Sequence, residues 1–321
     1  MIRIALVGCG EHSEGSHAAP LARYASEHPG AISLAAACDL NVARAEEFCR
    51  RFGFARAYSD LGELLAKETV DACVTVMPVG RIAEVGASLL ERGVPCVIEK
   101  PLGVSLAEVE RLARVARETG TPHMVSVNRR FIPYLNRAVQ FVSENGGPRY
   151  VRATMARHAR DEADFISTTA IHAVDALRHV AGEVADFRSK VVGDRRSSAH
   201  WYVISLDFGG GVAGRVEVFP TAGVVEETYE LFGEGARAQV LCGSGSQRSL
   251  KCWRGGQLEI DEAADDVPED VRNGGYGELV EFVRALAAGE RPRPTIEDVL
   301  PSSRICFSVA ESAARLTNEG S

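Results

Sequence analysis

Apolar and polar positions follow two different patterns along the chain, and the change comes after Val127. Up to that point, short apolar runs alternate with longer stretches whose apolar residues recur at helical spacing. Apolar strands that alternate with amphipathic helices are typical of a parallel sheet covered by helices on both faces. The predicted strands are residues 2–8, 32–39, 72–77, 96–98 and 124–127, and the predicted helices include residues 41–52, 82–92 and 106–118.

Strand-like patterns dominate from residue 128 onward. Three glycines at 209–211 lie between two alternating segments and predict a hairpin turn. The acidic segment 261–270 predicts an exposed loop. This half therefore predicts an α+β domain over residues 128–321, with a large, mainly antiparallel sheet and helices on one side. Its predicted strands are residues 150–155, 187–192, 201–208, 212–219, 228–232 and 238–241, and its predicted helices are residues 133–145, 171–180, 278–288 and 296–316.

Composition narrows the class of protein. The chain has 321 residues, of which 45% are apolar and 25% charged, as in an ordinary globular protein of two domains. Its net charge of −8 disfavours binding to the phosphates of nucleic acids. No apolar run reaches the roughly 18 residues of a membrane span. The first predicted strand follows Met1 directly, which leaves no room for a targeting peptide.

The eight cysteines are scattered without a CxxC pair. Their spacing fits neither a zinc site nor a disulfide scaffold. Several lie in apolar runs, where a reduced cysteine packs as a small hydrophobic residue. We therefore expect a cytoplasmic protein with reduced thiols and no metal site.

Gly8-Cys9-Gly10 directly follows the first predicted strand, as the phosphate turn of a dinucleotide-binding fold requires. The first glycine permits the tight turn, and the second lets a pyrophosphate approach the backbone. The helix that follows offers N–H groups to the phosphates. The GxGxxG motif is incomplete because Ser13 stands in the third glycine position. The candidate phosphate-loop residues are Gly8, Gly10, Glu11, His12 and Ser13.

Three carboxylates near this loop bear on nucleotide binding. Glu11 and Glu14 would repel a bound anion if they pointed inward. Asp39 ends the second predicted strand, where it can accept hydrogen bonds from ribose hydroxyls and repel a 2′-phosphate. Alternatively, Asp39 caps the helix that begins near Asn41. Residues 1–127 therefore predict a Rossmann dinucleotide-binding domain that prefers NAD, with NADP possible.

Glu99-Lys100-Pro101 stands where another apolar strand ends. The carboxyl end of a parallel strand faces the ligand crevice of a doubly wound sheet. A lysine there is a candidate proton donor or acceptor. Proline stiffens the backbone beside it, and an X-Pro bond can be cis. The alternative is a surface turn after the strand.

His172 and Asp175 are three residues apart in a predicted helix and share one face. Apolar neighbours predict that this helix is partly buried, and buried polar groups need partners. Substrate hydroxyls could supply them; alternatively, the two side chains form a hydrogen-bonded pair on the helix surface. Asn128-Arg129-Arg130 leaves the last strand of the first domain, and predicts either substrate contact or a salt-bridge anchor between domains.

Together these residues resemble the glucose-fructose oxidoreductase/inositol dehydrogenase (Gfo/Idh/MocA) family over nearly the whole chain. The segments that carry the resemblance are Gly8-Cys9-Gly10, Asp39, Pro78, Glu99-Lys100-Pro101, Asn128-Arg129-Arg130-Phe131, His172-Ala173-Val174-Asp175 and 276–282. The resemblance implies NAD(P)-dependent hydride transfer between the nicotinamide and a secondary alcohol or ketone of a sugar, polyol or related molecule.

The resemblance also implies roles for single residues. Lys100 would hydrogen-bond the reacting hydroxyl, His172 would serve as acid and base, and the Lys100–Pro101 bond would often be cis. Asp175, Asn128, Arg129 and Thr168 would contact the substrate. Met77, Pro78, Glu99 and Lys100 would join the phosphate loop and Asp39 in holding the cofactor. The family commonly forms homodimers or homotetramers.

The chain departs from the family pattern at two positions. Thr168 stands where many polyol dehydrogenases have aspartate, so His172 lacks a charge partner there, which Asp161 or Asp164 could replace. Ile82 stands in place of a second family histidine. These departures leave open a second function, a non-catalytic dinucleotide- or sugar-binding sensor of the same fold.

Overall fold

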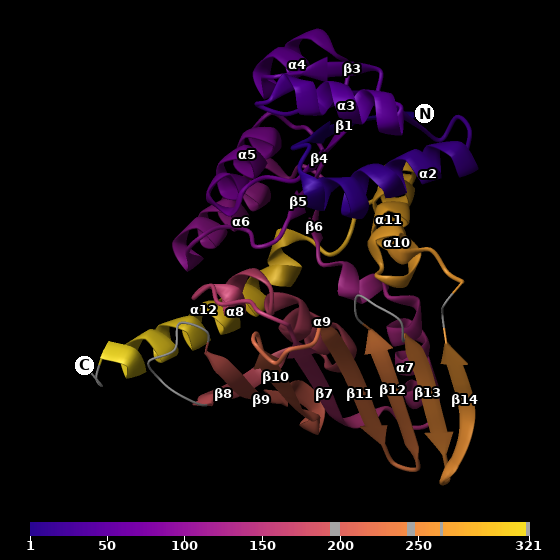
Figure 1. Ribbon diagram of the computed structural model, residues 1–321, viewed down its shortest axis with the longest axis vertical. Helices are drawn as coiled ribbons and strands as arrows, with labels where there is room; N and C mark the ends of the chain where they lie inside the picture. The colour runs from indigo at the N-terminus through magenta and orange to yellow at the C-terminus, as the bar shows by residue number, and fades with distance from the viewer. Residues whose placement is uncertain (193–199, 243–247, 264–265, 319–321) are drawn as a thin grey trace. The chain divides into compact units, whose positions relative to one another are not determined.

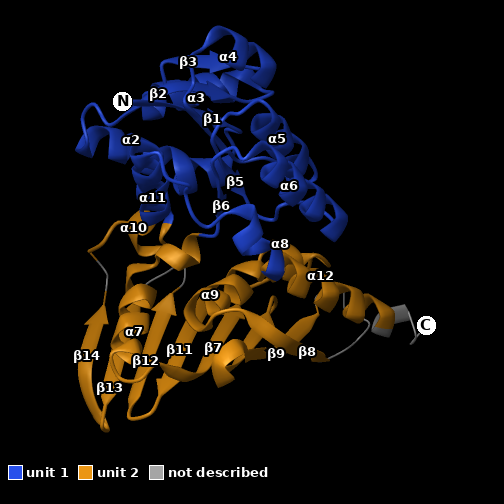
Figure 2. Cartoon of the chain, turned by 180° about the vertical axis from the view of Figure 1, so that it is seen from behind, with its two compact units in different colours: residues 1–127, 275–301 blue, residues 128–274, 302–321 orange. Residues whose placement is uncertain are grey.

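The computed structural model describes residues 1–192, 200–242, 248–263 and 266–318, and the chain divides into two compact units (Figures 1 and 2). Unit 1 contains residues 1–127 and 275–301, and unit 2 contains residues 128–274 and 302–321. The break after residue 127 lies where the sequence pattern changes. Residues 275–301, which the sequence pattern placed in the second domain, belong instead to unit 1.

Unit 1 is built on a six-stranded parallel sheet with the order β3-β2-β1-β4-β5-β6. The strands β4, β5 and β6 are buried at every residue, as expected of a sheet covered on both faces. Strand order reverses between β1 and β4, the point at which doubly wound sheets bind ligands. The strands are β1 (Ile2–Val7), β2 (Ile32–Cys38), β3 (Arg56–Tyr58), β4 (Ala72–Thr75), β5 (Cys96–Glu99) and β6 (His123–Ser126).

Helices lie on both faces of this sheet: α5 packs on α6, while α2 contacts α3 and α11 (Figure 1). Local sequence sets the helix ends; in α6 the Ser105 hydroxyl accepts the Glu108 amide, and Gly120 ends the helix with φ +66°. The helical elements are α1 (Glu11–Ser13), the π-helical turn η1 (Glu14–Ala18), α2 (Ala19–Glu27), α3 (Val42–Phe52), α4 (Leu61–Lys67), α5 (Val79–Glu91), α6 (Leu106–Thr119), α11 (Gly275–Ala288) and the first residues of α12 (Ile296–Asn318).

Unit 2 contains an eight-stranded sheet with the order β14-β13-β12-β11-β7-β10-β9-β8. Neighbouring strands are antiparallel except for β7 and β10, so the predicted fold class is confirmed. Gly209–Gly211 joins β9 to β10 as the predicted hairpin. The strands are β7 (Pro148–Ala156), β8 (Val184–Val192), β9 (Trp201–Phe208), β10 (Ala213–Phe219), β11 (Glu226–Gly233), β12 (Ala236–Cys242), β13 (Ser249–Arg254) and β14 (Gln257–Ala263).

The long helices of unit 2 pack on one face of this sheet. α7 (Pro133–Ser143) contacts β11, β12 and β13, and α9 (Ile171–Ala181) contacts β7 and β10. Every second residue of β12 is buried, which gives the sheet one covered face. The other helical elements are η2 (Asn128–Phe131), α8 (Phe165–Thr168), η3 (Gly209–Gly211), α10 (Glu269–Arg272) and the last residues of α12.

The prediction of an exposed loop over residues 261–270 is wrong at both ends. Strand β14 continues to Ala263, and α10 begins at Glu269; residues 264–265 lie outside the described residues. Alternating charged and apolar residues in 257–263 fit an edge strand with one exposed face, and this alternation is a better guide here than the acidic composition.

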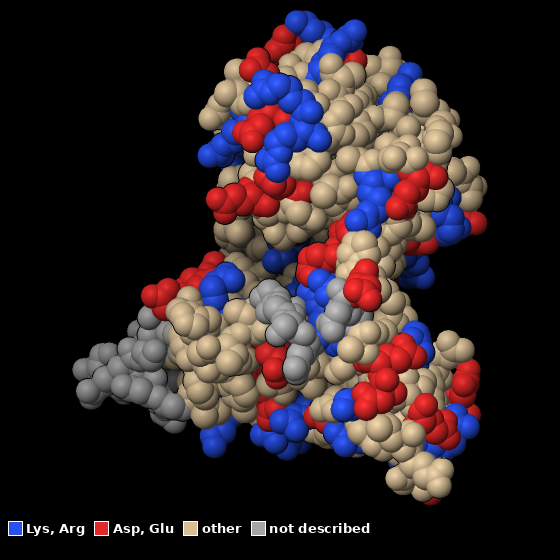
Figure 3. All heavy atoms as spheres, turned by 45° about the vertical axis from the view of Figure 1, so that its right-hand side comes forward, with Lys and Arg blue, Asp and Glu red and all other residues tan. Residues whose placement is uncertain are grey.

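The charged side chains and the cysteines of the structure are distributed as the sequence composition suggests. On the face seen in Figure 3, basic and acidic side chains intermix in each unit. All eight cysteines are described and free. Burial raises the pKa of the Cys38 thiol to about 11 and that of the Cys252 thiol to about 11, which keeps these groups protonated. No helix within the described ranges is long and apolar enough to cross a membrane.

Candidate active site

The phosphate turn of unit 1 requires its first glycine. Gly8 has φ +96°, a conformation that other residues rarely adopt, and a Cβ there would collide with the carbonyl oxygen of Val76. Gly10 has an extended backbone, and a Cβ added to it would meet no atom within 4 Å, so space is left beside the turn. The helical run begins with a bond from the Glu14 amide to the Gly10 carbonyl. These are the features that an approaching pyrophosphate needs.

The acidic residues of the loop are drawn away from the turn or exposed. Glu14 pairs with Arg51 of α3, whose Nη1 lies 2.9 Å from Glu14 Oε2. This contact lowers the pKa of Glu14, because the guanidinium stabilises the carboxylate. Glu11 is exposed. Repulsion of an anion by Glu14, the possibility left open by the sequence, is offset by Arg51.

Asp39 holds the phosphate turn against the end of β2. Its Oδ2 accepts a hydrogen bond of 2.8 Å from the Cys9 amide, and its Oδ1 accepts one of 2.8 Å from the Asn41 amide. The N-cap of α3 is Asn41, whose side chain accepts the Ala43 amide. Asp39 is therefore not the helix cap, and it lies next to the nucleotide turn.

Met77 and Pro78 line the same end of the sheet. The sulfur of Met77 would lie 3.6 Å from a Cβ on Gly8, so this side chain stands beside the turn. Pro78 is the N-cap of α5. Ile82, on the next turn of α5, is 3% exposed and packs in the core.

Glu99 ends β5 and is the buried centre of a polar cluster. Its Oε1 lies 2.7 Å from Nε2 of His17 and 3.1 Å from Nε2 of His12, and its Oε2 accepts a 3.0 Å hydrogen bond from the Lys100 amide. Burial alone would raise the pKa of Glu99, but the hydrogen bonds from the two imidazoles hold it well below its usual value. The Lys100–Pro101 bond is cis. The cluster thus joins the phosphate loop to Lys100.

His172 and Asp175 of unit 2 are both buried on α9, with exposures of 5% and 0%. Arg130 clamps Asp175 through Nε at 2.7 Å and Nη2 at 2.8 Å, and Ser302 donates to Oδ1 at 2.9 Å. Asp175 Oδ1 also lies 3.7 Å from Nη1 of Arg178. Protein groups therefore occupy both oxygens of Asp175, a different arrangement from the hydroxyl contact that the resemblance implies.

Asn128 and Arg129 also contact protein groups within unit 2. The Asn128 side chain donates to the Asn273 carbonyl at 2.9 Å. Arg129 donates to both oxygens of Glu227, at 3.1 and 2.6 Å. An anchoring ion pair, the alternative to substrate contact, is thus present, and it lies inside one unit.

Glu227 is a buried carboxylate that His172 influences electrostatically, and it was not predicted from the sequence. It lies on β11, is 4% exposed, and contacts Arg129, Arg157 and the Tyr229 hydroxyl. Burial would raise the pKa of Glu227, but Arg129, Arg157 and His172 hold it far below its usual value. A glutamate at an inward position of an alternating strand is a signal that could have identified it.

Neither Thr168, at the position of the missing aspartate, nor its two proposed replacements supplies a buried carboxylate. Thr168 ends α8, and its hydroxyl donates to the Asp164 carbonyl at 3.0 Å. Asp161 and Asp164 are exposed. Glu227, the buried carboxylate that His172 influences electrostatically, thus comes from strand β11 of the sheet.

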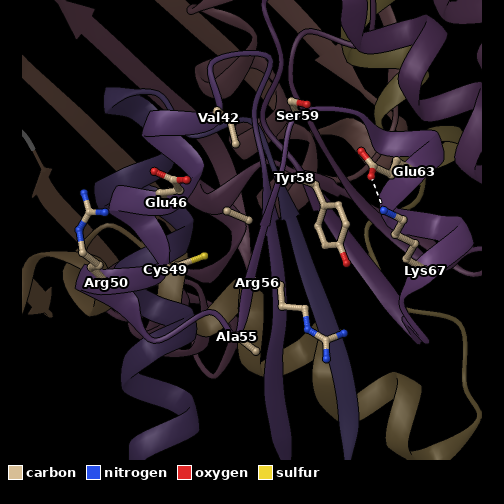
Figure 4. A pocket seen from close by; sticks show the side chains of 11 residues that line it. Val42, Glu46, Cys49, Arg50, Ala55, Arg56, Tyr58, Ser59, Glu63 and Lys67 are labelled. Atoms are coloured by element: carbon tan, nitrogen blue, oxygen red, sulfur yellow. Dashed lines mark hydrogen bonds and ion pairs between the residues drawn. The ribbon is translucent and has the colours of Figure 1, made fainter.

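A hollow of about 690 Å³ runs along the edge strand β3 of unit 1 (Figure 4). Charged side chains of both signs line it, and Lys67 pairs there with Glu63 at 2.6 Å. It contains none of the residues discussed above, so we assign it no part in the site.

Residues 2–128 match the profile of the GFO_IDH_MocA oxidoreductase family, described as an NAD-binding Rossmann fold. Residues 2–128 belong to this family. The Gfo/Idh/MocA assignment made from the motifs is thereby confirmed, and so is NAD as the family's cofactor.

Relatives of the chain include named dehydrogenases. The chain is 26% identical over 234 residues to scyllo-inositol 2-dehydrogenase (NAD(+)) of Bacillus subtilis. The aligned residues cover 68% of the chain and 66% of the relative. It is 27% identical over 274 residues to D-apiose dehydrogenase of Rhizobium rhizogenes. Here the aligned residues cover 80% of the chain and 74% of the relative.

Solved structures share the fold of the chain. An oxidoreductase from Agrobacterium radiobacter, in complex with NAD+, L-tartaric acid and magnesium, matches with a TM-score of 0.79 at 20% identity. The match covers 98% of the chain and 96% of that structure.

Proposed function

We propose that the chain is a dehydrogenase that transfers a hydride between NAD(P) and a secondary alcohol or ketone of a sugar, polyol or related small molecule. The inositol and apiose dehydrogenases among its relatives support this substrate class. The Rossmann unit supports the cofactor.

One observation carries the proposal: Glu99 contacts both the phosphate loop and Lys100. His12 of the loop lies 3.1 Å from Glu99 Oε1, and the Lys100 amide donates to Glu99 Oε2 at 3.0 Å. The residue proposed to bind the reacting hydroxyl is therefore fixed beside the residues proposed to hold the dinucleotide, within one unit.

The residues present fit a dinucleotide. The turn at Gly8 and Gly10 leaves the backbone open to a pyrophosphate, and Asp39 stands at the end of β2, where a ribose binds in this fold. When bound, the nicotinamide supplies or accepts the hydride.

Oxidation of an alcohol also requires removal of the hydroxyl proton. In this proposal the Lys100 ammonium donates a hydrogen bond to the reacting oxygen, and His172 takes up the proton as general base. Asp175 acts as a positioning residue, because it fixes Arg130 against the helix that carries His172. Asn128, Arg129 and Thr168 shape the substrate side of unit 2.

The test combines nucleotide binding with turnover. Fluorescence titration with NADH and NADPH measures affinity, and absorbance of the reduced cofactor measures turnover over a panel of sugars and polyols. Lys100→Ala should lower turnover by about 100-fold to 10,000-fold, the usual range for loss of proton-handling groups, while the NADH affinity stays within about threefold.

Lys67→Ala is the matched control. Lys67 is an exposed lysine of the same unit, and its substitution should leave both readouts as in the wild type. Turnover by Lys100→Ala at the wild-type rate would contradict the role of Lys100.

A non-catalytic sensor is the second candidate. It is favoured by the ion pairs that occupy Asp175 and Arg129, since these side chains then offer fewer contacts to a substrate. Tight NADH binding with no turnover over the whole panel would support the sensor.

A homodimer or homotetramer stays a prediction of the resemblance, which sedimentation analysis would test.

A further inference from the structure

His12, His17 and Glu99 direct three metal-ligating atoms at one point in unit 1. One nitrogen of each imidazole and a carboxylate oxygen all lie within 4.8 Å of one another. Glu99 Oε1 is 2.7 Å from Nε2 of His17 and 3.1 Å from Nε2 of His12. Two imidazoles and one carboxylate form a ligand set that suits Zn²⁺ and related divalent ions.

We propose that these three side chains bind a divalent transition-metal ion, for which Zn²⁺ is the reference. This departs from the expectation of no metal site, which rested on cysteine spacing. A zinc ion lies about 2.0–2.2 Å from nitrogen and oxygen ligands, which separates ligands in a tetrahedron by about 3.3–3.6 Å. The observed separations therefore need to widen by several tenths of an ångström to about 1 Å.

The backbone explains how residues five apart converge. In an α-helix, paired histidine ligands stand four residues apart on one face. His12 and His17 are five apart, and η1 (Glu14–Ala18) is a π-helical turn, which closes bonds one residue further along the chain. The ring centroids consequently lie 6.3 Å apart. An α-helical turn would direct the two rings differently.

The surroundings orient the ligands. The Lys100 amide holds Glu99 Oε2 at 3.0 Å, so that Oε1 faces the imidazoles. Nδ1 of His12 lies 3.5 Å from the Ser16 hydroxyl. Partners of this kind fix the ring nitrogen that faces a metal.

Burial differs among the three ligands. Side-chain exposure is 6% for Glu99 and 8% for His17 but 59% for His12. The site is therefore closed by protein on one side and reaches solvent through His12. Three protein ligands with an accessible side leave a fourth position for water or a small ligand, unlike structural zinc sites, which are closed by four protein ligands.

The same atoms could instead form only a hydrogen-bonded cluster, with the imidazoles donating to Glu99. Metal titration separates the two possibilities. The full chain, stripped with a chelator and dialysed, is titrated with Zn²⁺ by calorimetry and with Co²⁺ by visible absorption, which reports ligand geometry.

We expect one saturable Zn²⁺ equivalent per chain. His12→Ala should weaken that binding by at least about 100-fold, since loss of even an outer-shell partner costs about 10-fold to 100-fold. His28→Ala is the matched control, because His28 is an exposed histidine of unit 1 that stacks on Tyr24. It should bind as the wild type does.

Two results would overturn the proposal. One is wild-type protein that takes up no saturable Zn²⁺; the other is equal affinity in the wild type and His12→Ala. His17→Gln, with folding checked by circular dichroism, gives an independent measurement at the buried ligand. These readouts require neither nucleotide binding nor turnover, so they stand or fall separately from the proposed dehydrogenase activity.

Discussion

Each unit buries a carboxylate beside a predicted site residue, but the partners differ in kind. Glu99 of unit 1 faces two imidazoles and a backbone amide. Asp175 of unit 2 faces the guanidinium of Arg130 and the hydroxyl of Ser302. An imidazole can donate, accept or ligate a metal, whereas a guanidinium only donates and stays charged.

The partner therefore decides what a buried carboxylate can do. On the metal-site proposal, the Glu99 cluster would take up an ion without breaking a permanent arginine ion pair. The Asp175 and Glu227 clusters are fixed by arginines, so they hold elements in place. Motifs in the two units that look equally functional in sequence thus have different partners in the structure.

The largest expected effect is on unit 2. Asp175→Ala should lower the free energy of unfolding by about 3–5 kcal/mol, because it removes the carboxylate from a buried ion pair with Arg130. Urea denaturation followed by circular dichroism measures the change.

Glu262→Ala is the control for this prediction. Glu262 pairs with Arg137 at 2.5 Å, but their side chains are 43% and 44% exposed, so the loss should stay below about 1 kcal/mol. Similar losses for the two variants would contradict the view that Asp175 has a structural part.

In unit 1 the glycines of the turn should separate stability from binding. Gly8→Ala should cost about 1–3 kcal/mol through its positive φ, with more from the collision with Val76, as measured by thermal melting. Gly10→Ala meets no atom within 4 Å, so it should leave stability unchanged and weaken NADH binding by about tenfold.

Gly15→Ala is the control, because Gly15 also has open space around it and lies beyond the turn. It should change neither readout appreciably. Tight NADH binding by Gly10→Ala would contradict the placement of the pyrophosphate at this turn.

Local patterns made most of the fold predictable. The strand predicted over 201–208 is β9 (Trp201–Phe208), and buried apolar runs identified the parallel strands because both faces of that sheet are covered. Short elements were missed: β3 has three residues, too few to show a period. The last two sheet strands were missed because their polar, exposed faces resemble a loop.

The site was predictable by residue type but not by partner. Lys100 and Gly8 follow strands of known direction, so their end of the sheet could be inferred. The ion pair of Asp175 with Arg130 joins segments far apart in sequence, and so does the electrostatic effect of His172 on Glu227. No local period in the sequence reports either of them. His17 escaped notice because its approach to Glu99 depends on a π-helical turn that the sequence does not signal.

The smallest expected effect concerns acid stability in unit 2. Burial would raise the pKa of Glu227, but Arg129, Arg157 and His172 depress it below the 4.5 of a free glutamate. A depressed pKa stabilises the fold above pH 4.5, and that contribution is lost as the pH falls further. The free energy of unfolding should fall with a slope of up to about 1.4 kcal/mol per pH unit from this proton.

Glu227→Gln removes that titrating group while the arginines stay charged throughout. Urea denaturation between pH 6 and pH 3 should therefore give a flatter dependence for Glu227→Gln than for the wild type, although the variant is less stable at neutral pH because its arginines lose a buried carboxylate. Parallel curves for the two proteins would mean that the arginines do not hold Glu227 in its charged form. The contrast between the Glu227 cluster, fixed by arginines, and the Glu99 cluster, formed with imidazoles, would then lose its physical basis.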